Sequence, residues 1–112
     1  MTRYLISFDD GAMTFSEEDL PAVAKAAQEV VHEAKDAGVW LFGGGLQSQR
    51  ASVVATDGTV TDGPYPETKA VLGGFTVVDV ATRDEALVWA AKIARACRCA
   101  QEVRSIMADP EV

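Results

Sequence analysis

The sequence contains little cysteine and histidine, which limits the metal and redox sites that it can form. Among 112 residues there are two cysteines, Cys97 and Cys99, and one histidine, His32. Cysteines one residue apart cannot easily pair with each other, and with the histidine far away in the sequence they make a poor zinc-binding pattern. We therefore expect no metal site, and two reduced thiols in a reducing compartment.

Basic residues and long apolar runs are also lacking. The chain has 10 Lys and Arg against 17 Asp and Glu, which gives a formal net charge of −7. Such a charge disfavours nucleic acid, whose phosphates need a basic patch, and it disfavours anionic membranes. The longest apolar run is far shorter than a membrane span, and the acidic N-terminal stretch is unlike a signal peptide. We predict a cytoplasmic protein with no direct nucleic-acid partner and no membrane partner.

The residues that are present predict a single α+β domain over residues 1–112. A chain of this length with 48% hydrophobic residues can bury a real core. The expected elements are a strand at 3–8, a helix at 20–37, a strand at 39–42, a hairpin with strands at 51–56 and 59–61, a strand at 71–80, a helix after Thr82 and a strand at 102–107. This order, β-α-β-β-α-β with an inserted β-hairpin, predicts a ferredoxin-like fold with both helices on one face of an antiparallel sheet.

Local signals predict the ends of both helices. Asp19 is the expected N-cap of the first helix, with Pro21 in the first turn; Ser16 is the alternative cap, but it would leave Pro21 in the helix interior. Gly38 is the expected stop, and Thr82–Glu85 form a capping box for the second helix. The apolar stripe of the first helix consists of Leu20, Val23, Ala27, Val30, Val31 and Ala34. The opposite side carries mainly Lys25, Gln28, Glu29, His32, Lys35 and Asp36.

The central strands are apolar on both faces. A sheet with one wet face alternates apolar and polar residues, and the stretches 39–42 and 71–80 do not. Because both helices lie on one face, the other face needs a cover, and a second copy packed sheet to sheet is the economical one. We predict a homodimer through the sheet face, with an interface on the order of 1,600 Å² or more.

Glycines mark two further features. Asp57-Gly58 predicts a two-residue hairpin turn. Gly43–Gly45 is not a phosphate-binding loop, because no Lys-Ser/Thr follows and no helix begins there, and we expect no cofactor. These glycines are expected to permit a bulge or a close approach of the backbone.

A stiff polar loop at 61–69 is the main candidate site. It combines two prolines and a glycine with Asp62, Tyr65, Glu67 and Lys69, which could bind a polar small molecule or transfer protons. The alternative is a rigid turn in which Asp62 caps the turn, Glu67 and Lys69 are solvated and Tyr65 packs inward. We expect Asp62 to serve structure first, and Tyr65 and Lys69 to line any pocket.

The same loop resembles a known motif. Residues 62–65 and 67–69, followed by Leu72-Gly73-Gly74-Phe75, resemble the DGPF motif region of YCII-related proteins, with Tyr65 where the family usually has Phe. The resemblance continues over Ala37-Gly38-Val39, Gly44-Gly45-Leu46-Gln47, 84–90 and Glu102-Val103-Arg104. It implies a dimeric α+β barrel. It implies no specific function, because the family is largely uncharacterised, although some members are associated with extracytoplasmic-function sigma factors.

A catalytic pair suggested for relatives is incomplete in this chain. Its Asp is matched by Asp36, whereas its His position is matched by Ala27. His32 lies four residues before Asp36 and could meet it on the helix surface, where a carboxylate can orient an imidazole for general-base catalysis. The residues around His32 and Asp36 are of polar types that usually face solvent. The competing interpretation is therefore an ordinary exposed pair with no catalytic role. Asp36 and Asp62 remain the only candidates for a catalytic role.

Two functions are therefore compatible with the sequence. One is a small-molecule-binding domain, which could be an enzyme, with a pocket between helices and sheet and the loop at its mouth. The other is a non-enzymatic interaction protein that accompanies a transcription regulator such as an extracytoplasmic-function sigma factor. A polar pocket lined by loop residues would favour the first, and a closed barrel with an exposed apolar patch would favour the second.

Overall fold

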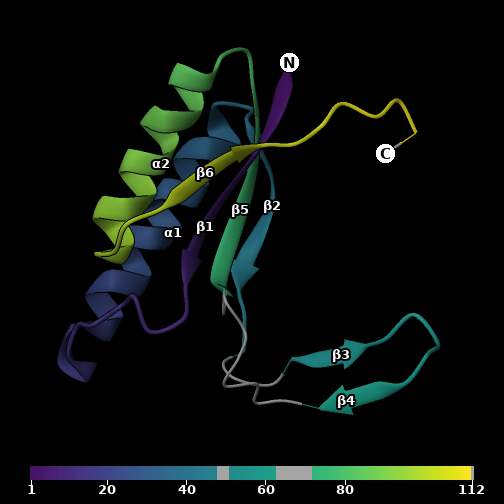
Figure 1. The fold of residues 1–112 in the computed structure, drawn as a ribbon. Coiled ribbons are helices and arrows are strands. Elements are labelled where there is room, and N and C mark those ends of the chain that lie inside the picture. Colours follow the sequence, from purple (N-terminus) through teal and green to yellow (C-terminus); the bar gives the residue numbers. More distant parts are fainter. Residues whose placement is uncertain (48–50, 63–71, 112) are drawn as a thin grey trace.

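An antiparallel sheet with both helices on one face forms the body of the protein (Figure 1). The computed structural model describes residues 1–47, 51–62 and 72–111. The sheet has the order β2-β5-β1-β6 and antiparallel pairing throughout. Its strands are β1 (Thr2–Asp9), β2 (Trp40–Gly45), β5 (Leu72–Val80) and β6 (Glu102–Ser105). The helices are α1 (Leu20–Asp36), preceded by the short 3-10 helix η1 (Glu17–Asp19), and α2 (Arg83–Cys97). This α+β arrangement is compatible with the predicted ferredoxin-like fold.

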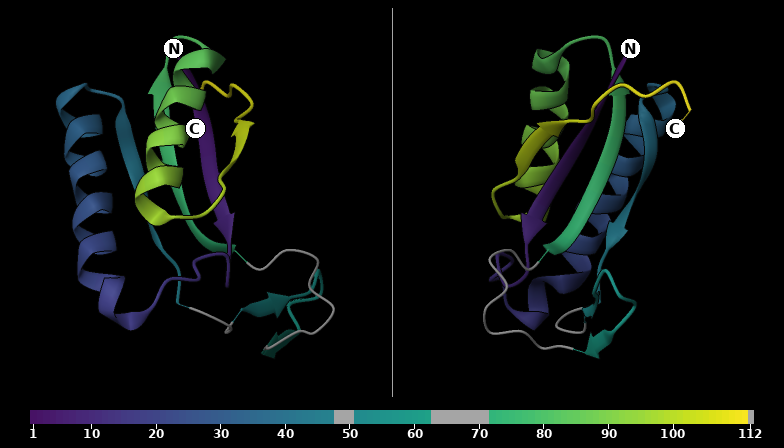
Figure 2. Two further views of the ribbon diagram at one scale, coloured as in Figure 1. Left: turned by 90° about the vertical axis from the view of Figure 1, so that its left-hand side faces the viewer. Right: turned by 45° about the vertical axis from the view of Figure 1, so that its right-hand side comes forward.

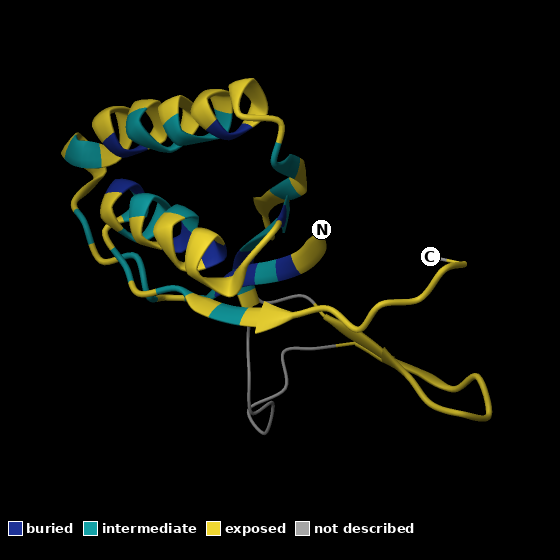
Figure 3. Ribbon diagram, turned by 90° about the horizontal axis from the view of Figure 1, so that it is seen from above, coloured by how far each residue is buried: buried dark blue, intermediate teal, exposed yellow. Residues whose placement is uncertain are grey.

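The hydrophobic core lies between α2 and the two central strands. Side chains at alternate positions of β1 and β5 point to the helices, and alanines of α2 pack on them; the buried cluster is Tyr4, Ile6, Val78, Val80, Ala86 and Ala90. Small residues on α2 let this helix approach the sheet closely. In contrast, α1 packs mainly against α2. Consequently α2 lies on the core, and α1 stands farther from the sheet (Figure 3).

Two ion pairs connect α1 with α2. Glu33 pairs with Lys92, and the Asp19 carboxylate accepts a hydrogen bond from Arg98 Nη1 at 2.9 Å. Asp19 is the N-cap residue of α1, as predicted, but its side chain does not make the capping bond expected there. Asp19 ends η1, makes no side-chain capping bond, and its carboxylate binds Arg98 instead. Pro21 lies in the first turn of α1, as predicted.

The other predicted helix signals are confirmed. Gly38 has a φ of +74°, and the N–H of Val39 donates to Ala34 O at 3.1 Å, which is the Schellman ending that glycine favours. At the start of α2 the Glu85 N–H donates to Thr82 Oγ1 at 3.2 Å. The Glu85 carboxylate accepts the N–H of Ala81 and not that of Thr82, so the capping box closes one residue earlier than the usual pattern.

The inserted hairpin forms a separate two-stranded sheet, β3 (Ser52–Val54) and β4 (Val60–Asp62). Its turn differs from the predicted two-residue type. The Ala55 N–H donates to Thr59 O at 2.8 Å, which leaves three residues in the loop, and Gly58 adopts a φ of +88°. Asp57 stabilises this loop because its carboxylate accepts the Thr59 N–H at 2.8 Å, and hydrogen bonds from Thr59 lower the pKa of Asp57. The longer loop is the three-residue alternative, in which glycine takes the left-handed position.

The strand β2 ends in the glycines 43–45, as the sequence predicted. The register of β2 on β5 shifts between Trp40 and Phe42, so a bulge places these two aromatic side chains on opposite faces of the sheet. Trp40 is paired with Val78 on the helix side, and Phe42 is paired with Val77 on the other side. The bulge thus supplies one aromatic side chain to each face.

Candidate functional site: an apolar cavity between the helices and the sheet

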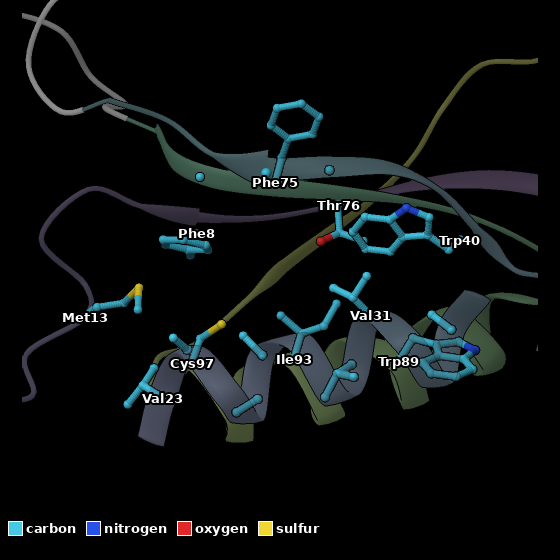
Figure 4. A pocket seen from close by; sticks show the side chains of 18 of the residues that line it. Phe8, Met13, Val23, Val31, Trp40, Phe75, Thr76, Trp89, Ile93 and Cys97 are labelled. Carbon is cyan, nitrogen blue, oxygen red and sulfur yellow. The ribbon is translucent and has the colours of Figure 1, made fainter. Parts of the chain in front are cut away.

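A cavity of about 600 Å³ lies between α1, α2 and the helix-facing side of the sheet (Figure 4). The predicted apolar stripe of α1 forms one wall, from Leu20 to Ala34. The sheet contributes Phe8, Trp40, Thr76, Val78 and the backbone of Gly43–Gly45, and α2 contributes Trp89, Ile93, Ala96 and Cys97. The stripe therefore does face the protein interior, but it borders an open space and not a filled core.

Small residues explain why this space is open. The α1 wall includes Ala24, Ala27 and Ala34, and the β2 wall carries consecutive glycines. A Cβ added at Gly45 would meet none of the described atoms within 4 Å. Ion pairs connect α1 with α2 near both ends of α1, and they hold it over the cavity. Trp40 is the one large side chain that β2 contributes to the described wall.

Glycines also position the aromatic side chains of the wall. A Cβ on Gly74 would lie 2.7 Å from Phe8 Cζ, and one on Gly73 would lie 2.8 Å from Phe8 Cε2. The Phe8 ring therefore packs directly on the backbone of β5. In the same way a Cβ on Gly43 would come within 3.0 Å of the Trp40 ring. Of the glycines 43–45, for which the sequence predicted a bulge or a close approach, Gly43 shows a close approach, whereas a Cβ at Gly44 or Gly45 would meet none of the described atoms within 4 Å.

Polar groups are few in the cavity wall. None of the described residues that line it is Asp, Glu, Lys, Arg or His. Thr76 Oγ1 has no hydrogen-bond partner among the described residues, and its side chain points from β5 towards the helices (Figure 4). Burial, and secondarily the neighbouring Cys99, raise the pKa of Cys97 above its usual range, so this thiol stays protonated near neutral pH. The described wall therefore carries no charge at pH 7.

The predicted site residues lie elsewhere where they are described. His32 and Asp36 are exposed on the polar side of α1, and no hydrogen bond or ion pair joins them in the described structure. Asp62 lies at the end of β4, where its carboxylate accepts the Ser52 hydroxyl at 2.5 Å. Tyr65, Glu67 and Lys69 lie outside the described residues. The structure thus brings none of the described candidates into the cavity, and Ala27, at the position that matches the family's histidine, lines it.

Among residues 1–47, 51–62 and 72–111, no group of three or more His, Cys, Asp or Glu side chains is arranged to hold a metal ion. Within the same part of the chain, no helix is long and apolar enough to cross a membrane.

The arrangement defines a class of small α+β domain in which two helices enclose an apolar chamber on one side of an antiparallel sheet. Residues 3–108 match the model of the YCII-related domain, and the chain belongs to this family. This confirms the resemblance to YCII-related proteins. A search of curated proteins gave no match.

Proposed function

We propose that the protein is a homodimer that binds a small molecule in the cavity between its helices and its sheet. The observation that supports this most strongly is the cavity itself. Its volume of about 600 Å³ lies within the range of roughly 300–1,000 Å³ that is typical of small-molecule sites. Because the described wall carries no acid or base that ionises near neutral pH, it supports binding better than acid–base catalysis.

The polar loop can complete this site. The sequence predicts that Tyr65, Glu67 and Lys69 contact a polar ligand, and the described wall contributes apolar surface. We propose that the cavity holds the apolar body of the ligand, and that loop side chains contact any polar group at its mouth. Asp62 is then a structural residue of the hairpin, since its carboxylate is bonded to Ser52.

The homodimer is supported by the outer face of the sheet, on the side away from the helices. Leu5 pairs with Val77, and Val77 pairs with Phe42, so these three side chains form a row across three strands. The Phe75 ring lies 5.5 Å from that of Phe42. We call Leu5, Phe42, Phe75 and Val77 the outer apolar patch. Phe42 is 64% exposed, which is unusual for a large aromatic side chain in a monomer with a complete core.

The outline of the chain supports the same assembly. The β3–β4 hairpin and the C-terminal segment both project to the side of the sheet opposite the helices (Figures 1 and 2). The hairpin contacts none of the other described helices and strands, and its Val53, Val54 and Val60 are exposed. The radius of gyration is 15.6 Å, against about 13 Å for a compact chain of this length. A two-stranded hairpin is marginal in water, so a second copy between the projecting segments would stabilise it.

The second candidate is the interaction protein that accompanies a transcription regulator. The outer apolar patch favours it, since an exposed patch of this kind binds proteins. A second copy of the chain would cover the same patch, and no other partner protein would then be needed. The two functions are distinguished by the purified chain alone, because a stable dimer covers the patch whereas a monomer leaves it free for another protein.

Filling the cavity tests the proposed site. We expect Ala27→Phe to abolish binding of the fluorescent probe N-phenyl-1-naphthylamine, because the new ring occupies the space next to the α1 wall. Ala22→Phe is the matched control, since Ala22 is exposed on the same helix and does not line the cavity. Fluorescence titration measures both. Equal binding by the parent and Ala27→Phe would place the probe elsewhere and reject the site.

Removal of the histidine should have no effect on binding or stability. His32 is exposed and has no bonded partner among the described residues. We expect His32→Ala to change the free energy of unfolding by less than about 0.5 kcal/mol, as at other surface positions, and to leave probe affinity unchanged. Urea denaturation and probe titration provide the measurements. A clear loss of affinity would restore the His32–Asp36 pair as a functional site.

A further inference from the structure

The charge of the cavity wall restricts the chemistry of what it can bind. An ion moved from water into such a site loses part of its hydration and finds no counter-charge among the described lining residues, which disfavours its binding. Glu33 pairs with Lys92 and Asp19 pairs with Arg98, and none of these four residues lines the cavity. Lys92 Nζ lies 5.3 Å from the ring centroid of the lining residue Trp89. Cys97, the one ionisable side chain in the described wall, is held neutral by burial.

The shape of the wall favours a flat ring. Phe8, Trp40 and Trp89 come from three different elements, so aromatic surface is available on the sheet side and on the α2 side. The backbone at Gly45 is bare, which allows a planar group to approach the strand closely. Aromatic rings stack offset or edge to face on such residues, and this contact stabilises the complex beyond the effect of the area buried.

Thr76 supplies the one hydroxyl group of the described wall, which also carries the indole N–H groups of Trp40 and Trp89 and the Cys97 thiol. Thr76 Oγ1 has no partner in the described part of the chain, and a hydroxyl can donate one hydrogen bond and accept others. A ligand atom that can donate or accept a hydrogen bond would therefore satisfy Thr76 when both are removed from water.

From the uncharged wall, the aromatic side chains and the single free hydroxyl, we infer that the ligand class of this cavity is an uncharged aromatic molecule that forms a hydrogen bond with Thr76. The inference rests on the proposed function, because it concerns the same site. It predicts that phosphate, carboxylate and ammonium groups stay outside the part of the cavity that the described residues line, and it assigns Thr76 as the residue that orients the ligand.

Two probes that differ by one charge test the ligand class. N-phenyl-1-naphthylamine and 8-anilino-1-naphthalenesulfonate share the same rings, and only the second carries a sulfonate. We expect the neutral probe to bind at least about tenfold more tightly, and we expect Ala27→Phe to remove its binding. Gly45→Leu fills the cavity from the sheet side and serves as a second variant, should Ala27→Phe not fold.

The outcomes distinguish an error in the ligand class from an error in the location of the binding site. If both probes bind equally and both are displaced by the filling variants, the site stands and the uncharged class is wrong. If neither filling variant reduces binding of either probe, the proposed site itself is rejected.

The role of Thr76 is tested with 1-naphthol and naphthalene. Thr76→Val should weaken binding of 1-naphthol about 2–10-fold, the effect of one hydrogen bond, and leave naphthalene unchanged. An equal effect on both would show that Thr76 only shapes the wall.

Discussion

Replacing Phe42 by glutamate is expected to convert the proposed dimer into monomers. Phe42 is 64% exposed within one chain, so the fold of the single chain hardly depends on this ring. In a dimer formed through the sheets, the carboxylate would be buried among the apolar side chains of the partner's patch without a counter-charge, which costs several kcal/mol. Two-fold symmetry places the change in the interface twice. We expect the dimer dissociation constant to rise by at least about 100-fold, measured by sedimentation equilibrium.

A matched surface substitution serves as the control. Val88 is 56% exposed, similar to Phe42, but it lies on α2 on the other side of the molecule from the outer apolar patch. Val88→Glu should therefore remain a dimer with the parent's dissociation constant. A Phe42→Glu protein that stays dimeric would show that the copies associate through another surface.

Gly74→Val is expected to destabilise the fold strongly and to damage the cavity. The first carbon of the new side chain would lie 2.7 Å from Phe8 Cζ and 3.1 Å from Gly44 O, so the ring must leave its place on β5. Overpacking of this kind costs about 1–3 kcal/mol. We expect a loss near the upper end, because valine adds two further carbons, together with loss of probe binding.

The residue paired with Gly74 across the sheet provides the control. Gly45 is its register partner on β2, and a Cβ there meets none of the described atoms within 4 Å. Gly45→Val should leave the free energy of unfolding unchanged or raise it by a few tenths of a kcal/mol, since valine favours strands. Denaturation by urea compares the two variants. If Gly74→Val unfolds at the parent's urea concentration, the Phe8 ring does not depend on this glycine.

Much of the fold could be predicted because its signals are local. The spacing of apolar residues identified α1 and the face that it turns inward, and Gly38 and Thr82 marked the ends of helices by backbone geometry and hydrogen bonding. The predictions differ from the structure where contacts between residues far apart in the sequence determine the local geometry. Asp19 is bound by Arg98, which is 79 residues away in the sequence, and no local pattern predicts this contact. The sequence predicted a two-residue hairpin turn at Asp57-Gly58. The loop contains three residues instead, because the Ala55 N–H pairs with Thr59 O.

The cavity was harder to predict than the fold. An apolar helix stripe that lines a chamber and one that fills a core have the same sequence pattern. The difference depends on how far α1 stands from β2, which is set by its contacts with α2. Polar side chains such as Asp36 and Asp62 stand out in the sequence as candidates for function, since acid–base and ion-binding chemistry uses them. The available signals for the cavity were the small residues, Ala24 and Ala27 on one wall and Gly43–Gly45 on the other.

The most direct test of the cavity as the binding site is a titration with N-phenyl-1-naphthylamine followed by amide resonances in two-dimensional ¹H–¹⁵N NMR spectra. If the probe enters the cavity, the amides of Ala27, Val31 and Gly45 should shift, and those of Val88 and Val60 should remain in place. The shifts should saturate at one probe per chain. Shifts confined to Phe42, Val77 and the hairpin, with Ala27 and Gly45 unchanged, would show that the probe binds the outer face of the sheet and would contradict the proposed site.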